Sequence, residues 1–403
     1  MKNNLCLGCG ACAQGSAASK ISMGLSSDGY IRPRISTPLS KPEDEEFGRI
    51  CPGLEVKHKS KDERWTELWG PVEGSHVGWS KDDEIRHAAS SGGGITSTLC
   101  YVLDHGLVDA VLHIGVSTAD PLLNEWVVSE TSDEAKTRSG SRYAPAAPLM
   151  GLTDILSRHA RIAIVGKPCD IVAARNLAAE FPAVREAVKY FISFMCAGVP
   201  SYKGTEAVLH RLGTTPAETT SFRYRGNGWP GYATAVDKAG QQFQMSYQES
   251  WGRILNKHLQ LRCKICVDGT GEFADITFAD AWHGGDEGYP KFEEQAGRSL
   301  ILTRTAVGRD LLDGAALNGY VQHEPLDLAE VIKMQPYQAI RKKLLLSRIV
   351  AMRMFGLRPP RYDIRNMFKL SLTAGLKPNA VSFLGMAKRT FALSKMAQRR
   401  AKK

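Results

Sequence analysis

Cysteine residues are the most chemically informative feature of this 403-residue sequence. Three of them form a Cys-x2-Cys-x2-Cys run, and a fourth precedes a proline far downstream. Three thiolates at two-residue gaps suit three corners of an iron–sulfur cubane, and a remote Cys-Pro suits the fourth corner. The pattern predicts a 4Fe-4S cluster, and the alternative is a structural zinc site, although zinc sites usually use two separated pairs. The predicted ligands are Cys6, Cys9, Cys12 and Cys51.

A second cysteine pair, Cys263 and Cys266, is separated by two residues and by itself suits zinc equally well. Cys169 and Cys196 each follow a predicted buried strand, at the sheet edge where open α/β folds place their sites. We expect these four cysteines to form a second four-thiolate site. The alternative for Cys169 and Cys196 is ordinary core packing, which we expect for Cys100 because it lies in an apolar helix.

Strands and helices alternate around these cysteines. The sequence predicts a strand over 161–166 followed by a helix over 170–181, and a strand over 189–195 followed by a helix over 201–212. Such alternation predicts an α/β fold whose central strands form a parallel, doubly wound sheet.

A serine- and glycine-rich turn precedes a further predicted helix over 95–104. Hydroxyls and free amides at a helix N-terminus form an anion site, and glycine lets a phosphate approach the backbone. The turn matches neither GxGxxG nor a P-loop, and a flexible turn is the alternative. Nearby, Arg142 and Tyr143 are candidates to contact a nucleotide; surface residues are the alternative. The candidates in the turn are Ser90, Ser91, Gly92, Gly93 and Gly94.

The segment 222–232, FRYRGNGWPGY, concentrates aromatic residues, arginines and glycines. Stacking on a ring with a guanidinium nearby is one use of that composition, and a turn between strands is the alternative. The candidate ring contacts are Asn227, Gly228 and Trp229.

The net charge of +10 is concentrated at the C-terminal end. Residues 341–403 hold 17 basic residues and one acid, whereas the first 340 hold 35 basic and 41 acidic residues. The basic balance therefore does not indicate a nucleic-acid partner. The segment 341–357 has the pattern of a basic amphipathic helix, which suits a membrane surface or an acidic protein such as ferredoxin; packing on its own domain is the alternative.

No uncharged apolar run reaches the roughly 18 residues of a membrane span, and cysteines occupy the place of a signal peptide's apolar core. The odd cysteine count also argues against a disulfide framework. We expect a cytoplasmic protein, with possible association at the cytoplasmic face of a membrane through the tail 341–403.

Eight collinear strings between residues 1 and 335 together resemble the beta subunit family of coenzyme F420 hydrogenases and dehydrogenases, which includes reductases of hydroxymethyl- and divinyl-chlorophyll compounds. The strings are CLGCGAC, RICPG, SSGGG, GSRYAP, VGKPCDIVAARNL, FMCAGVPS, FRYRGNGWPG and CKICVD with ADITFADAW.

The resemblance implies a flavoprotein that binds FAD and one or two 4Fe-4S clusters, with hydride transfer at the flavin and single electrons passing through the clusters. By position, the cysteines from Cys169 to Cys266 match the family's cluster ligands near the flavin, and those from Cys6 to Cys51 match a ferredoxin-like set of longer members. The chain departs from many relatives at Ala279-Asp280, where they have Gly-Asp, and at GKPC in place of GTPC. The family's substrates are too varied to infer F420.

The expected fold is α/β with mixed sheets. It would comprise a ferredoxin-like 4Fe-4S segment (1–60), a flavin-binding domain (61–155), a domain with the second cluster (156–340) and a helical basic tail (341–403). The expected function is an oxidoreductase that passes electrons between a ferredoxin-like or deazaflavin donor, the clusters, FAD and a small organic substrate. The alternatives are a non-catalytic electron-transfer subunit and a zinc protein without a redox role. No general acid is evident, because the aspartates after the last cysteine pair are expected to be structural.

Overall fold

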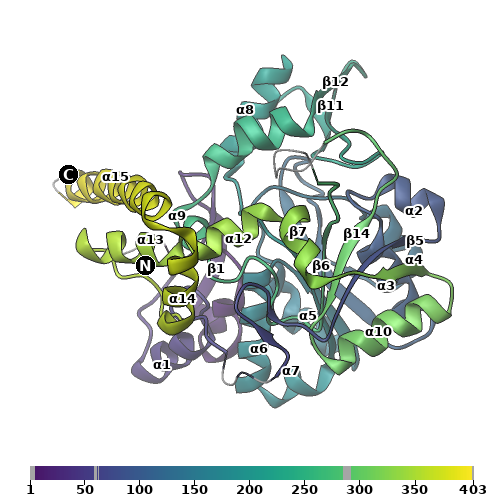
Figure 1. The fold of residues 1–403 in the computed structure, drawn as a ribbon, viewed down its shortest axis with the longest axis horizontal. Coiled ribbons are helices and arrows are strands. Elements are labelled where there is room, and N and C mark those ends of the chain that lie inside the picture. Colours follow the sequence, from purple (N-terminus) through teal and green to yellow (C-terminus); the bar gives the residue numbers. More distant parts are fainter. Residues whose placement is uncertain (1–4, 59–60, 62, 285–291, 402–403) are drawn as a thin grey trace.

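The computed structural model describes residues 5–58, 61, 63–284 and 292–401, the last eight of these by backbone alone. A central sheet carries helices on both faces, and the C-terminal helices gather at one side, near the N-terminal segment (Figure 1). Among the described residues, no helix is both long enough and apolar enough to cross a membrane.

Eight strands form the central sheet in the order β15-β5-β14-β13-β9-β8-β6-β7. The four strands β13, β9, β8 and β6 run parallel, and the outer strands pair antiparallel. This arrangement confirms the expected mixed α/β fold, and strands from both 61–155 and 156–340 contribute to it. The strands are β5 (Gly74–Ser80), β6 (Ala110–Val116), β7 (Asn124–Ser129), β8 (Ile162–Gly166), β9 (Val188–Phe194), β13 (Ile276–Asp280), β14 (Ser299–Thr303) and β15 (Val321–Pro325).

The central strand β8 is buried along its whole length, as expected for a parallel strand covered on both faces. Its Ile162 and Ile164 side chains point into one core, together with α5 (Leu152–Arg158) and α6 (Pro168–Glu180). Ala163 and Val165 point into the opposite core. The helices on that second face are α3 (Gly94–Asp104) and α10 (Ala306–Leu317).

Two smaller units flank the sheet. One is a three-stranded antiparallel sheet packed with α8 and two short helices, and the other is the N-terminal cysteine segment with one hairpin and one helix. The first contains α8 (Tyr202–Leu212), β10 (Thr219–Arg223), β11 (Tyr232–Asp237), β12 (Gln242–Ser246), η4 (Gln248–Ile254) and η5 (Leu255–His258). The second contains η1 (Ala11–Ala13), η2 (Gly15–Lys20), β1 (Ile21–Leu25), β2 (Ile31–Ile35) and α1 (Lys41–Ile50).

Shorter elements complete the described fold. They are β3 (Trp65–Thr66), β4 (Gly70–Pro71), α2 (Asp83–Ala88), α4 (Ser132–Thr137), η3 (Pro148–Gly151), α7 (Pro182–Ala187), α9 (Leu261–Lys264), η6 (Leu328–Glu330) and α11 (Val331–Met334).

The basic tail is helical and packs on the body of the protein. It consists of α12 (Pro336–Lys343), α13 (Leu345–Met354), α14 (Ile364–Ala374) and α15 (Leu376–Ala401), so the helix expected over 341–357 is divided at Leu344. Leu345 and Met352 share a core with Leu5 near the N-terminal cysteines and with Ile265 of the second cysteine pair.

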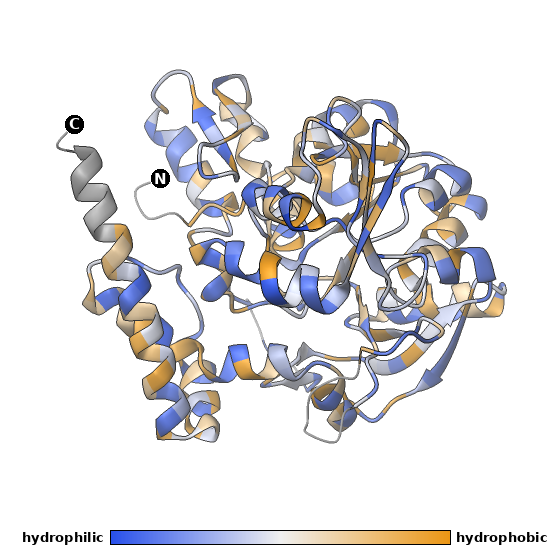
Figure 2. Cartoon of the chain, turned by 90° about the horizontal axis from the view of Figure 1, so that it is seen from above, coloured by the Kyte–Doolittle hydropathy of each residue, from blue (hydrophilic) through white to orange (hydrophobic). Residues whose placement is uncertain are grey.

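Part of the tail's apolar surface stays uncovered. Figure 2 shows apolar and polar segments alternating along these helices. The exposed apolar residues of α14 and α15 include Ile364, Phe368, Leu372, Val381 and Leu384. Contact of this tail with a membrane stays a prediction.

Candidate functional site

The N-terminal cysteines converge on one small cavity, which Cys6, Cys9, Cys12 and Cys51 all line. Gly8 (φ +74°) and Gly10 (φ +87°) turn the backbone through the left-handed region, which glycine adopts most readily. The Gly8 amide donates to the Cys6 sulfur at 3.4 Å. Backbone amides that donate to ligand sulfurs are a general means of tuning iron–sulfur sites.

The second set of cysteines comes together from three separate elements. Cys169 lies in the first turn of α6, Cys196 follows β9, and Cys263 lies in α9 just before Cys266. Cys169 and Cys196 each lie close enough to Cys266 for the charges of these groups to interact, and Cys263 acts on both Cys196 and Cys266. The Val199 amide donates to the Cys263 sulfur at 3.4 Å. The fold therefore brings the cysteines of each predicted set near one another, and their role as cluster ligands stays a prediction.

Burial raises the pKa of six of these thiols above the usual value, namely Cys9, Cys12, Cys51, Cys169, Cys196 and Cys266. Burial raises the pKa of Cys12 and of Cys196 to about 12, and that of Cys51 to about 11. Metal coordination deprotonates a thiol outright, so a bound cationic centre would reverse this effect.

A buried arginine lies between the two sets. Arg262 is 1% exposed, and its Nη2 donates to the carbonyl of Pro52, beside Cys51, at 3.2 Å. Its Nε and Nη1 atoms have no hydrogen-bond partner among the described residues, while Cys169, Cys263 and Cys266 lie close enough to interact with its charge. The guanidinium carbon of Arg262 lies 5.5 Å from the centre of the Tyr362 ring, but a buried cation without an anionic partner is still costly, by several kcal/mol. A net-anionic thiolate cluster at the second set would supply the missing counter-charge.

A second buried arginine comes from the basic tail. The Arg341 Nη2 of α12 donates to the Cys196 carbonyl at 3.0 Å, and the charge of Arg341 acts on Cys266, Cys196 and Cys263. Gly269 makes this approach possible, because a Cβ atom at that position would lie 1.3 Å from Arg341 Nη2. The sequence pattern missed Arg341, because a buried basic residue in a basic tail carries no local signal.

The ion pair of Lys167 and Asp170 connects the two sets. Lys167 Nζ donates to the two Asp170 oxygens at 2.6 and 2.7 Å, and both side chains are buried. Burial would lower the pKa of Lys167, but Asp170 and the thiols Cys169 and Cys9 raise it above its usual value. One buried cation therefore interacts with a cysteine of each set.

Within the described part of the chain, no three His, Cys, Asp or Glu side chains converge on a point that would hold one metal ion. Cys100 lies apart from both sets in α3, where its sulfur contacts the Ser132 carbonyl at 3.8 Å, as expected for a packing residue.

A large cavity of about 1370 Å³ lies beside the second set, with Cys196 in its wall. Six of the predicted cofactor residues line it: Ser90, Ser91, Gly93, Gly94, Arg142 and Tyr143. Gly92, Asn227, Gly228 and Trp229 are not among its described lining residues. Aromatic rings of Tyr143, Tyr247, Trp251, Trp282 and Phe292 also line it, which suits a flat ring system.

The serine–glycine turn packs tightly against strands β13 and β14 of the central sheet. A Cβ at Gly92 would lie 2.7 Å from the Ser299 amide, and one at Gly94 would lie 2.8 Å from the Phe278 ring. The turn therefore fits closely on the sheet. Within the described ranges no side chain caps the start of α3, so its first amides can bind an anion in the cavity.

Arg142 lines the cavity, but its guanidinium nitrogens already donate to other groups of the protein. Its guanidinium donates to Asn124 Oδ1 at 2.8 Å and to the Phe222, Pro121 and Leu123 carbonyls. This residue joins β7 to the flanking sheet. Tyr143, by contrast, presents its ring beside Trp251, at a centroid distance of 4.8 Å.

Asn227, Gly228 and Trp229 lie in the connection between β10 and β11, and they do not line the large cavity. Trp229 is buried and stacks on Trp282 at 4.7 Å, and its Nε1 donates to Asp280 Oδ1 at 2.7 Å. Asn227 has φ +54°. Trp229 acts on the cavity indirectly, by supporting Trp282.

The aspartates after the last cysteine pair are held by the protein. Asp280 accepts from both terminal nitrogens of the buried Arg225 at 2.9 Å, a bidentate pair in the cavity wall. Asp275 accepts from the Phe191 amide and from Arg175, and one oxygen of Asp268 accepts from three successive amides. These contacts agree with the structural role expected from the sequence.

Comparison with known proteins matches two sequence models to this chain. Residues 75–153 match the N-terminal part, and residues 159–329 the C-terminal part, of "Coenzyme F420 hydrogenase/dehydrogenase, beta subunit". This chain belongs to the coenzyme F420 hydrogenase/dehydrogenase beta subunit family.

Named relatives agree with this assignment. The coenzyme F420 hydrogenase subunit beta of Methanothermobacter thermautotrophicus is 24% identical over 295 residues, covering 70% of this chain and 95% of the relative. The F420-dependent formate dehydrogenase 1 subunit beta of Methanococcus maripaludis is 27% identical over 252 residues, covering 60% and 59% respectively. These relatives are subunits of oxidoreductases, so the chain has a redox role.

A solved structure supports the fold. A chain of the F420-reducing [NiFe] hydrogenase complex from Methanosarcina barkeri superposes with a TM-score of 0.57 at 19% identity. The match covers 75% of this chain and 98% of that one.

The two family matches cover neither end of this beta-subunit homologue. The N-terminal cysteines precede residue 75, and Arg341 follows residue 329. Both ends nevertheless pack against the second cysteine set, through Arg262 and Arg341.

Proposed function

We propose that this chain is an iron–sulfur flavoprotein oxidoreductase with a 4Fe-4S cluster at each cysteine set and FAD in the large cavity. The observation that carries the proposal is the buried arginine Arg262, which lies close enough to Cys169, Cys263 and Cys266 to interact with them and has two donors without a partner among the described residues. An anionic iron–sulfur cluster at the second cysteine set would provide the counter-charge that the buried Arg262 lacks.

When bound, the clusters supply single-electron transfer and FAD supplies one- or two-electron chemistry, including hydride transfer. The chain's own residues determine the order of the sites. Lys167 and Asp170 lie between Cys9 of the first set and Cys169 of the second, and Cys196 borders the cavity. This arrangement supports a route from the N-terminal set through the second set to the cavity.

The cavity residues support FAD as its occupant. The uncapped N-terminus of α3 offers free amides to a diphosphate, and Tyr143, Trp251 and Trp282 offer flat surfaces to rings. Arg225 and Asp280 neutralise each other in the wall and hold it rigid. A volume of about 1370 Å³ exceeds the roughly 300–1,000 Å³ of a typical single-ligand pocket, which leaves room for an organic substrate.

A second candidate function is an electron-transfer subunit that has no substrate of its own. It is favoured by the names of the relatives, which are subunits of hydrogenases and dehydrogenases. In that case a partner protein, ferredoxin or another redox protein, delivers or accepts the electrons. Turnover of an organic substrate by the isolated chain would distinguish the two functions.

The test is anaerobic purification of the full chain followed by iron, acid-labile sulfide, zinc and flavin analysis. We expect about eight irons per chain, two four-iron clusters, and one releasable FAD. Cys263→Ser is expected to remove about half of the iron, because it removes one ligand of the second cluster only. Cys100→Ser is the matched control, because Cys100 belongs to neither set.

Two outcomes would contradict the proposal. Colourless protein with stoichiometric zinc would assign the cysteines to a structural metal site. Unchanged iron in Cys263→Ser would show that the second set does not hold a cluster.

A further inference from the structure

Helices α14 and α15 each bury one face and leave apolar side chains exposed on another. Met367 of α14 and Met386 of α15 lie in the core that these helices share with the N-terminal segment. On α14, Ile364, Phe368 and Leu372 are exposed, and because they are four residues apart they form one stripe along the helix. The buried faces already attach both helices to the protein, so the exposed stripe is not needed for that packing.

The exposed apolar surface continues across the turn that joins the two helices. Gly375 (φ +78°) ends α14, and Leu376 begins α15 directly after it. Leu372 is 68% exposed and Leu376 is 92% exposed, so two leucines protrude, one on each side of the turn. Val381 and Leu384 are exposed further along α15. Apolar side chains therefore extend over two helices and do not occur singly.

Basic side chains accompany this apolar surface. Neither α14 nor α15 contains an acidic residue. Arg365 and Lys369 are exposed on α14, each directly after a residue of the apolar stripe. Lys377 and Lys388 are exposed on α15, and their spacing from Val381 places all three on one side of that helix. Exposed apolar residues interspersed with cations are typical of a basic amphipathic surface.

The carboxylates beside this surface are paired with cations. Glu67 forms an ion pair with Lys369 at 3.0 Å. Asp363 accepts from the Arg365 amide at the start of α14 and forms an ion pair with Lys61 at 2.6 Å. With these acids neutralised, the remaining exposed cations of both helices give the surface a positive charge.

We propose that this surface docks on an anionic membrane, with its apolar side chains inserted at the boundary between headgroups and acyl chains and its cations on anionic headgroups. A membrane is favoured over an acidic protein because Leu376 protrudes. A protein partner would have to supply a pocket of matching shape, whereas fluid lipid accepts the side chain without one. The proposal is independent of the proposed function, because it involves neither the cysteines nor the large cavity.

Vesicle flotation of the anaerobic full chain tests the proposal. The vesicles are pure phosphatidylcholine and phosphatidylcholine mixed with phosphatidylglycerol, each at low and at high salt. We expect the wild type to float with the anionic vesicles at low salt. It should float less with the neutral vesicles and at high salt, because the attraction to anionic headgroups is then absent or screened.

The variant Leu372→Gln with Leu376→Gln removes the two protruding leucines. We expect it to bind the anionic vesicles about tenfold or more weakly, because two apolar side chains no longer enter the lipid. Its matched control is Val307→Gln with Leu317→Gln, which changes exposed apolar residues of α10 on the opposite side of the molecule (Figure 1) and should bind as the wild type does. Thermal unfolding followed by circular dichroism shows that each variant is folded.

The variant Lys377→Gln with Lys388→Gln tests the contribution of charge. We expect it to bind the anionic vesicles about tenfold or more weakly and to leave binding to the neutral vesicles unchanged. Its matched control is Lys203→Gln with Lys238→Gln, at exposed lysines in α8 and in the turn between β11 and β12.

The proposal is overturned if the wild type floats with neither kind of vesicle, or if the leucine variant and its α10 control weaken binding equally. It is also overturned if only the lysine variant loses binding, which would indicate attraction of charge without insertion. Binding to ferredoxin that depends on Leu372 and Leu376, without flotation, would assign the surface to an acidic protein. Dimerisation that depends on the same leucines would assign it to a second copy of this chain.

Discussion

Arg262 shows how a single residue can couple two sites. Its side chain touches the carbonyl beside Cys51 and lies among Cys169, Cys263 and Cys266, so its charge acts on both sets. In the proposed function it is a positioning residue that also sets the electrostatic potential at the second cluster. A nearby cation stabilises the more negative, reduced form of a cluster.

Replacement of this cation tests that role. We expect Arg262→Gln to lower the reduction potential of the second cluster by on the order of 60 mV, tenfold in a one-electron equilibrium. Arg262→Lys should restore most of the change, because it keeps the charge. An anaerobic redox titration followed by electron paramagnetic resonance measures the potential.

The matched control is Arg309→Gln, which removes an exposed arginine of α10 that pairs with Glu73 and Asp310. An unchanged potential in Arg262→Gln with full iron content would show that this arginine only fills space.

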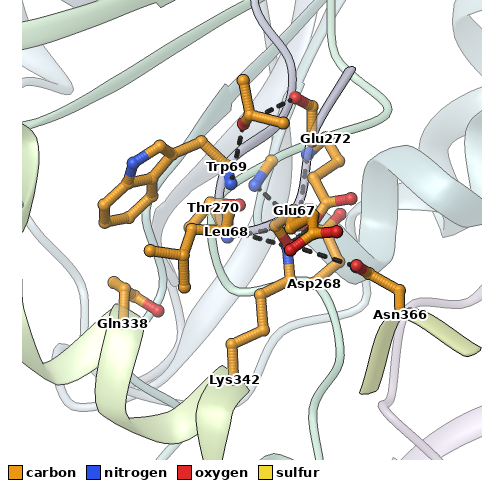
Figure 3. A network of polar contacts seen from close by, with 12 residues as sticks. Glu67, Leu68, Trp69, Asp268, Thr270, Glu272, Gln338, Lys342 and Asn366 are labelled. Atoms are coloured by element: carbon orange, nitrogen blue, oxygen red, sulfur yellow. Dashed lines mark hydrogen bonds and ion pairs between the residues drawn. The ribbon is translucent and has the colours of Figure 1, made fainter. Parts of the chain in front are cut away.

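At the scale of elements, helix α12 ties the tail to the loop that follows the last cysteine pair. Lys342 forms an ion pair with the buried Glu272 and donates to the Leu68 carbonyl at 2.8 Å (Figure 3). His58 Nε2 lies 3.1 Å from the second Glu272 oxygen. Burial would raise the pKa of Glu272, but Lys342 and His58 hold it at about 2, so the carboxylate stays charged.

Breaking this pair should loosen the tail. Lys342→Met leaves the buried Glu272 carboxylate with His58 but without its lysine, and we expect a loss of about 3 kcal/mol in the free energy of unfolding. For a domain of this size the melting temperature falls by on the order of 10 °C. Anaerobic thermal unfolding followed by circular dichroism measures it.

The double variant Lys342→Met with Glu272→Gln is the control, because it removes both charges and should recover part of the loss. Lys333→Met, at an exposed lysine of α11, should change little. Equal melting temperatures for wild type and Lys342→Met would contradict the proposed clamp.

At the scale of the whole molecule, the order of the sites implies a direction of access. The N-terminal set lines its own small cavity, and only the second set borders the large one. In the proposed function, a protein donor of single electrons would therefore deliver them through the N-terminal set, Cys6, Cys9, Cys12 and Cys51.

Loss of the N-terminal cluster should slow electron delivery from a protein donor to the flavin without removing the flavin. We expect Cys12→Ser to remove about half of the iron and to keep the flavin. Reduced ferredoxin should then reduce the flavin more slowly than in wild type, whereas dithionite, a small reductant, should still reduce it. Stopped-flow absorbance of the flavin measures both rates, and equal ferredoxin rates would rule out the N-terminal set as the entry point.

Several features of this molecule were predictable because they depend on local sequence. The short apolar segments and the alternation of strands with helices placed β8, β9, α6 and α8 within one or two residues of their ends. The strand ends placed Cys169 and Cys196 at one edge of the sheet, where the structure unites them with Cys263 and Cys266. Ligand spacing within a loop or turn is itself local, so the cysteine sets could be recognised.

The roles of charged and aromatic residues depended on contacts between distant segments. Arg341 and Arg389 look alike in the basic tail, yet the fold buries the first beside Cys196 and places the second in the cavity wall. Trp229 looks like a ligand contact, yet it packs behind Trp282. The sequence by itself determined which atoms can bind metal, and the tertiary structure decided which charges face them, because burial and counter-charge arise only when remote elements pack together.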